Sequence, residues 1–176
     1  MKKILFAVIT VLALVPLVSY AKSPFGLKWE TPKVDLLGEV IREDGISVIV
    51  ELYVPKPNSI YKDYAGYTND NGLYAVSANT HFIKDDYFGE VGKKQFYNVI
   101  RFLEKSGYNK TNALIKSTES KSGFYECINQ SGCNFYMWVG VDKDGDRASA
   151  SIKSLGNDSG YISVQYVKKG LSIHGF

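Results

Sequence analysis

Three stretches in the last third of the chain alternate apolar and polar side chains, and this alternation constrains the fold most. The stretches are residues 134–141, 147–155 and 161–167. Side chains that alternate with a period of two point to opposite faces of a β-strand. Turn-forming sequences at residues 142–146 and 156–160 join the three stretches. We therefore predict a C-terminal meander of three antiparallel strands.

Residues 89–105 have the spacing of an amphipathic helix. Phe96, Val99, Ile100 and Leu103 fall on one face of such a helix. The Ser-Gly pair that follows is typical of a helix C-terminus. This is the main helix that the sequence predicts.

Further strands are expected before this helix. Residues 39–42 and 46–54 flank an Asp-Gly pair, which is a strong hairpin signal. In the second strand, a period of two predicts one shared face for Ile46, Val48, Val50, Leu52 and Val54. Residues 72–83 are predicted as a strand. Residues 61–67 fit a strand or an irregular tyrosine-rich connection, and residues 111–120 fit a short helix or a strand.

These elements predict an α+β fold, with an antiparallel sheet, or sheets, and one main helix packed on one face. Short connections between successive strands favour antiparallel pairing. Before the first strand, residues 22–29 form an arm that is too short and too interrupted by proline for a regular element. We expect its apolar side chains, Phe25, Leu27 and Trp29, to dock on the body.

Residues 1–21 have the pattern of a bacterial Sec-type signal peptide. Two lysines precede an apolar run over residues 4–18, and small residues stand at Ser19 and Ala21. The run is shorter than the roughly 20 residues of a membrane span. No cysteine stands at the predicted cleavage point, so a lipoprotein is not expected. We predict a single α+β domain over residues 22–176, located in the periplasm or secreted, without stable membrane insertion after cleavage.

The charge of the chain excludes some classes of partner. The leader accounts for two lysines of the formal net charge of +3, which leaves +1 for residues 22–176. Neither a nucleic-acid-binding surface nor a polybasic membrane patch is expected at so low a charge. The composition is instead rich in aromatic residues, with 13 Tyr and 9 Phe, as is typical of β-rich domains and of protein interfaces.

The two cysteines, Cys127 and Cys133, are expected to form a disulfide. An even number of closely spaced cysteines in an exported chain usually pairs. A redox role would require the C-x-x-C spacing, and a zinc site would require two more ligands. The remaining histidines, His81 and His174, are the only further candidates. We predict a structural disulfide and no metal.

Two polar motifs in the sequence have simpler explanations than a metal or catalytic site. Residues 142–146 carry aspartates at alternate positions, like part of a calcium loop, but the sixth and twelfth residues of the pattern are Arg147 and Lys153. A hairpin turn explains the motif better. His81, close to Asp85 and Asp86, is a candidate general base, but no Gly-x-Ser-x-Gly nucleophile motif is present. We predict no catalytic residues and no cofactor.

A group of tyrosines supplies the candidate binding residues Tyr61, Tyr64, Tyr67 and Tyr74. The first three lie in a region rich in turn-forming residues, where binding sites are common. Together with Lys62 and Asp63 they would form a polar-aromatic contact patch. The alternative is that these rings pack over one face of the sheet.

The opening of the predicted mature chain, Phe25-Gly26-Leu27-Lys28-Trp29, resembles a group of small exported bacterial proteins that begin with Phe-Gly, two variable residues and Trp-Gly. Their tyrosine-rich last strand is similar to residues 160–166. Glu30 stands where the group has glycine. The resemblance implies an exported α+β protein and no particular activity.

The sequence thus favours a non-catalytic binding module that contacts another envelope or exported protein, such as an inhibitor, an immunity-type protein or an adaptor. The alternative is a carrier of a small ligand or lipid, with an apolar pocket between helix and sheet. A small hydrolase with His81 in its site is the third hypothesis. A pocket of several hundred Å³ would favour the carrier, and clustered exposed aromatic residues would favour the binding module.

Overall fold

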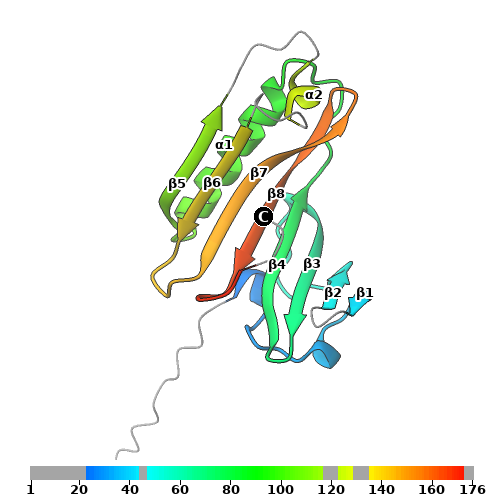
Figure 1. The fold of residues 1–176 in the computed structure, drawn as a ribbon, viewed down its shortest axis with the longest axis vertical. Helices are drawn as coiled ribbons and strands as arrows, with labels where there is room; N and C mark the ends of the chain where they lie inside the picture. Colours follow the sequence, from blue (N-terminus) through cyan, green and yellow to red (C-terminus); the bar gives the residue numbers. More distant parts are fainter. Residues whose placement is uncertain (1–22, 44–46, 117–122, 129–134, 173–176) are drawn as a thin grey trace, which may run out of the picture.

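One antiparallel sheet forms the body of the protein (Figure 1). The structure is a computed structural model that describes residues 23–43, 47–116, 123–128 and 135–172. Within these residues, eight strands follow the spatial order β1-β2-β3-β4-β8-β7-β6-β5. The strands are β1 (Glu39–Glu43), β2 (Ser47–Val50), β3 (Tyr61–Asn69), β4 (Gly72–Thr80), β5 (Asn109–Lys116), β6 (Phe135–Val141), β7 (Arg147–Gly156) and β8 (Ser159–Val167). The helices are η1 (Pro24–Gly26), η2 (Lys33–Asp35), α1 (Glu90–Lys105) and α2 (Phe124–Ile128).

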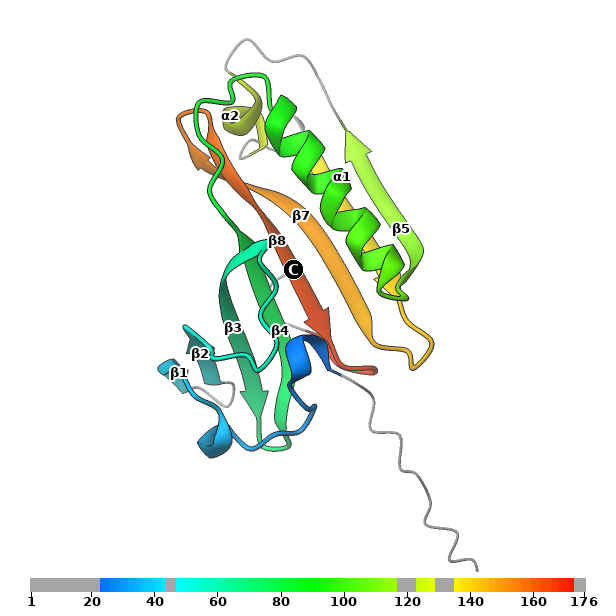
Figure 2. The same cartoon turned by 180° about the vertical axis from the view of Figure 1, so that it is seen from behind.

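The sheet consists of two four-stranded meanders that meet at its centre. β1 to β4 form the first meander and β5 to β8 the second, and β4 pairs with β8 where they meet. α1 lies between β4 and β5 in the chain and packs on β6, β7 and β8. Figure 2 shows α1 across this half of the sheet, with η1 and the connection from β2 to β3 over the other half. The predicted α+β class is therefore confirmed, and the predicted C-terminal strands lie side by side as β6, β7 and β8.

The main helix agrees with its prediction. Phe96, Val99, Ile100 and Leu103 are all buried. Ser106 caps the C-terminus, and Gly107 follows with a φ of 100°. At the N-terminus, the carboxylate of Asp86 accepts hydrogen bonds from the backbone N–H groups of residues 91 and 92. The 3.6-residue periodicity was enough to locate this element because one helix face is fully covered.

The predicted strands of the last third are also present. In β6, Tyr136 and Trp138 are buried while Phe135 is exposed, as the alternation predicts. In β8, Ile162 and Val164 are buried. Of the two ambiguous segments, residues 61–67 lie in β3 and residues 111–116 in β5. The short helix α2 was not predicted.

The predicted single face over residues 46–54 is wrong. β2 ends at Val50, and Glu51 adopts a φ of 49°. This left-handed residue resets the alternation. Ile49 is buried on one side of Glu51, and Leu52 and Val54 are buried on the other. Asp44, Gly45 and Ile46 lie outside the described residues, but β1 and β2 pair as the predicted hairpin.

The N-terminal arm docks as predicted. Phe25, Leu27 and Trp29 are partly buried and pack against the main core. The indole Nε1 of Trp29 donates a 2.5 Å hydrogen bond to Asp146, in the turn between β6 and β7. The backbone N–H of Glu30 donates to the carbonyl of Leu73. The predicted leader, residues 1–21, lies outside the described residues.

Candidate functional site

The four candidate tyrosines belong to two separate clusters. Tyr61 and Tyr64 are buried in the main core, because a bulge in β3 between Tyr61 and Asp63 turns both rings to the same side. Tyr74 is buried in a second, smaller cluster, and Tyr67 packs against that cluster. The structure therefore does not bring the four rings together, and their role in binding stays a prediction.

Phe25 is the centre of an aromatic group on the helix side of the sheet. Its ring meets those of Tyr61, Tyr64 and Tyr166 edge to face, with centroids 5.5, 4.8 and 5.3 Å away. Tyr166 also meets Tyr108 at 5.8 Å. Phe25 itself has a left-handed backbone, with φ 61° and ψ 22°. Non-glycine residues rarely adopt this conformation, and such residues occur more often at binding sites.

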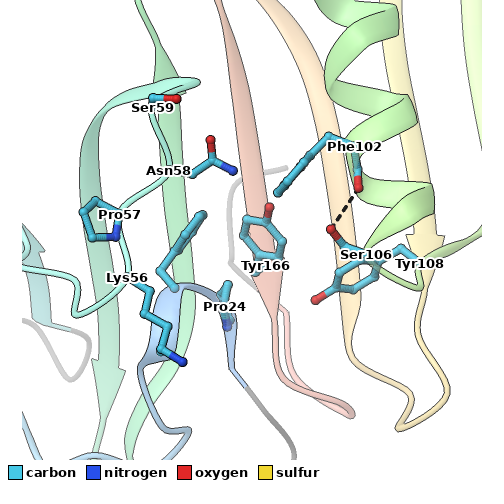
Figure 3. Close-up of a pocket in the computed structure, with 11 residues that line it drawn as sticks. Pro24, Lys56, Pro57, Asn58, Ser59, Phe102, Ser106, Tyr108 and Tyr166 are labelled. Atoms are coloured by element: carbon cyan, nitrogen blue, oxygen red, sulfur yellow. Dashed lines mark hydrogen bonds between the residues drawn. The ribbon is translucent and has the colours of Figure 1, made fainter.

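A cleft of about 530 Å³ opens beside this aromatic group (Figure 3). Tyr166 of β8 forms its floor. One wall comes from η1 and residues 56–59, and the other comes from the end of α1 and Tyr108, which follows α1. Three separate segments thus meet over β8. The lining residues are Pro24, Phe25, Gly26, Lys56, Pro57, Asn58, Ser59, Phe102, Ser106, Tyr108 and Tyr166.

Asn58 is held in place by Tyr64. The Tyr64 hydroxyl accepts a hydrogen bond from the Asn58 backbone N–H at 2.8 Å and donates one to the Asn58 carbonyl at 3.1 Å. The side-chain Oδ1 of Asn58 accepts from the N–H of Ile60 at 3.0 Å. The other end of the amide, Nδ2, has no hydrogen-bond partner within the described part of the chain. In Figure 3 the amide group lies beside Tyr166.

The tyrosine hydroxyls in and beside the cleft are uncharged. Burial is the main cause that raises the pKa of Tyr61, to about 12, and it also raises the pKa of Tyr166 well above its usual value. Burial, followed by the nearby charges of Asp142 and Asp146, raises the pKa of Tyr108. All three phenols therefore keep their proton at neutral pH and can both donate and accept. The Tyr108 hydroxyl has no hydrogen-bond partner among the residues that the structure describes.

His81 and the aspartates of residues 142–146, the other candidates from the sequence, offer fewer groups for binding or catalysis. His81 is exposed. Asp86, which is near it in the sequence, is buried. Its carboxylate caps α1 and accepts a hydrogen bond from the Tyr125 hydroxyl at 3.0 Å. Oδ1 of Asp142 accepts from the N–H groups of residues 144 and 146, as in a turn. In the described ranges, no group of three or more His, Cys, Asp or Glu residues could hold a metal ion.

The structure describes only one of the two cysteines of the predicted disulfide. Cys127 is buried on α2, and among the described residues there is no free cysteine. Cys133 and His174 lie outside the described residues. The pairing of Cys127 with Cys133 therefore stays a prediction.

A second hollow, of about 500 Å³, lies over β6, β7 and β8. Its lining includes Met137, Ser151, Tyr161 and Ser163, which alternate with the buried side chains of their strands and so belong to the sheet face away from α1. None of the helices within the described ranges is long and apolar enough to cross a lipid bilayer.

Comparison with known proteins adds no assignment. No model of a known protein family matches the chain, and no curated protein matches it. The similarity of residues 25–29 to small exported proteins therefore stays an expectation. A pocket between helix and sheet was one of the alternatives from the sequence, but the residues that line the cleft were not predicted. Asn58, Phe102 and Tyr108 come from segments whose contact depends on the path of the chain, and no sequence motif links them.

Proposed function

We propose that the chain is an exported, non-catalytic binding protein whose cleft over Tyr166 holds a small ring-shaped ligand. Of the functions that the sequence favoured, this is the carrier alternative. The observation that supports it is the cleft of about 530 Å³, which joins aromatic rings to uncharged polar groups. Its volume falls within the roughly 300–1,000 Å³ that is typical of small-molecule sites.

The chemistry of the lining supports binding rather than catalysis. The cleft-lining residues include no carboxylate, histidine or cysteine. Apart from the tyrosines, Lys56 is the one lining residue that could act as a base toward Ser59 or Ser106, and Figure 3 shows its ammonium apart from both serines. The hydroxyl of Ser106 instead donates to the backbone carbonyl of Phe102 at 2.9 Å (Figure 3).

Closing the cleft tests this proposal. Ser59 is exposed at the cleft, so Ser59→Trp should fill it without disturbing the core. We expect ring-shaped compounds in a mixed small-molecule set to show ligand-observed NMR contacts with the native protein and to lose them with Ser59→Trp. The matched control is Ser149→Trp, because Ser149 lines the hollow on the other face. Contacts that persist in Ser59→Trp, or that only Ser149→Trp removes, would contradict binding in the cleft.

A protein partner is the second candidate function, and one surface favours it. Val34, Leu37, Ile41 and Tyr53 are apolar and exposed. The backbone N–H of Tyr53 donates to the carbonyl of Leu37, which brings two of these residues together beside the free edge of β1. Contiguous exposed apolar surface marks protein contacts more often than single exposed side chains do, and Leu37 and Tyr53 form such a pair. Capture of an envelope protein that is lost with Leu37→Asp but kept with Ser59→Trp would support this candidate.

A further inference from the structure

We propose that the ligand of the cleft is an uncharged sugar ring, an inference that rests on the proposed binding function. The cleft combines aromatic rings, hydroxyl groups and an amide around a floor that is itself a tyrosine. Each of these features corresponds to a property of a sugar. Sugars present C–H groups along the ring and hydroxyl groups around its edge.

The aromatic lining suits the C–H groups of a sugar. Phe25 and Tyr108 stand edge to face against Tyr166, at interplanar angles of 85° and 61°. Phe102 lines the cleft from the helix side, and Figure 3 shows its ring reaching toward Tyr166. The face of an aromatic ring carries partial negative charge and attracts weakly positive hydrogens. A ring-shaped ligand between the two walls would therefore meet aromatic surface on both sides.

The polar lining suits hydroxyl groups. Tyr108 and Ser59 offer hydroxyls that both donate and accept, and Asn58 offers the two hydrogens of Nδ2. Sugar hydroxyls also donate and accept, so they can match such groups in either direction. The Tyr64 hydroxyl holds the backbone of Asn58 through two hydrogen bonds. Asn58 is therefore positioned before any ligand arrives, which lowers the entropic cost of binding.

The charges around the cleft favour an uncharged ligand. Lys56 is the charged residue of the lining. Its side-chain carbons pack near Gly26, and Figure 3 shows its ammonium pointing away from Tyr166. On the opposite wall, burial and then the nearby charges of Asp142 and Asp146 raise the pKa of Tyr108. The carboxylate of Asp146 accepts hydrogen bonds from Trp29 and from the N–H of Lys169. No single sign of charge dominates, so an ionised ligand would lose hydration without gaining a partner.

Three sugars with the same ring provide the test. We expect titration calorimetry of the native protein, at mildly acidic pH where glucosamine is a cation and glucuronate an anion, to show that glucose binds and that both charged sugars bind several-fold more weakly. Tyr108→Phe should weaken glucose binding about threefold to tenfold, as for the loss of one neutral hydrogen bond. Tyr161→Phe makes the same change at the second hollow and should leave binding unchanged.

The outcomes separate this inference from the proposed function. Tighter binding of either charged sugar than of glucose, or equal glucose binding by the native protein and Tyr108→Phe, would overturn the sugar inference. So would the binding of benzyl alcohol, a ring with a single hydroxyl, in preference to glucose. If such a compound bound and Ser59→Trp abolished its binding, the proposed function would stand without the sugar. If no ring compound bound at all, both would fail.

Discussion

At the scale of single residues, Phe25 shows how packing holds a backbone that the residue itself disfavours. A left-handed conformation costs a residue with a side chain roughly 1–2 kcal/mol. Phe25 meets three tyrosine rings edge to face, and each such pair is worth about 0.5–1.5 kcal/mol. Its carbonyl also accepts a 2.9 Å hydrogen bond from the N–H of Lys56. The ring contacts therefore outweigh the strain and fix one wall of the cleft.

Replacing Phe25 separates these two effects. Both Phe25→Ala and Phe25→Gly remove the ring, so both should lower the free energy of unfolding, by about 2 kcal/mol or more. Glycine tolerates the φ of 61°, so Phe25→Gly should be more stable than Phe25→Ala by about 1 kcal/mol. In most positions the order is the reverse. Urea denaturation measures both values, and an alanine variant as stable as the glycine variant would show that the backbone is not strained.

At the scale of elements, the carboxylate of Asp86 links the start of α1 to α2 through hydrogen bonds. Asp86 accepts from the N–H groups of Val91 and Gly92, and from the hydroxyl of Tyr125 at 3.0 Å. Gly92 is buried, and a Cβ at this position would lie 2.3 Å from the Tyr125 hydroxyl oxygen. The close approach of the two helices therefore requires a glycine inside α1.

Gly92→Ala should consequently destabilise the protein. In an open helix this change stabilises by up to about 1 kcal/mol, but here the clash should cost about 1–3 kcal/mol. Tyr125→Phe removes the hydroxyl, so the alanine should cost less in that background. A double-mutant cycle of unfolding free energies measures the difference. Lys94→Ala, at an exposed position of the same helix, is the control. Equal costs of Gly92→Ala in both backgrounds would show that the Tyr125 hydroxyl does not cause the clash.

The elements that could be predicted from the sequence are those with one buried face and regular backbone. α1, β6 and β8 kept their periodicity throughout, so their buried residues could be identified in advance. Prediction failed where one residue breaks the period, as Glu51 does after β2. α2 is only five residues long and too short to show a periodicity. Likewise, the lining of the cleft could not be predicted, because Phe25, Asn58 and Tyr108 meet only through tertiary packing.

At the scale of the whole molecule, the two meanders share one seam in the sheet. β4 pairs with β8 over residues 75–79, and almost all of β4 is buried. The arm crosses the same boundary, since Trp29 donates to Asp146 and Glu30 forms an ion pair with Lys168. Side chains from both meanders belong to one core cluster, including Tyr64 and Leu73 of the first and Trp138 and Ile162 of the second. Neither meander can separate without exposing this shared core.

We therefore expect the two meanders to unfold together. The chain has two tryptophans, Trp29 in the arm that crosses the seam and Trp138 in the second meander. Trp138→Phe leaves Trp29 as the only tryptophan, and Trp29→Phe leaves Trp138, so selective excitation of tryptophan follows one site at a time. Each change will alter stability, so the comparison is made within a variant: its fluorescence midpoint in urea should equal its far-UV circular dichroism midpoint. Separate midpoints in either variant would mean that the pairing of β4 with β8 does not couple the two meanders. The cleft, whose residues come from both meanders, would then be lost before the sheet unfolds.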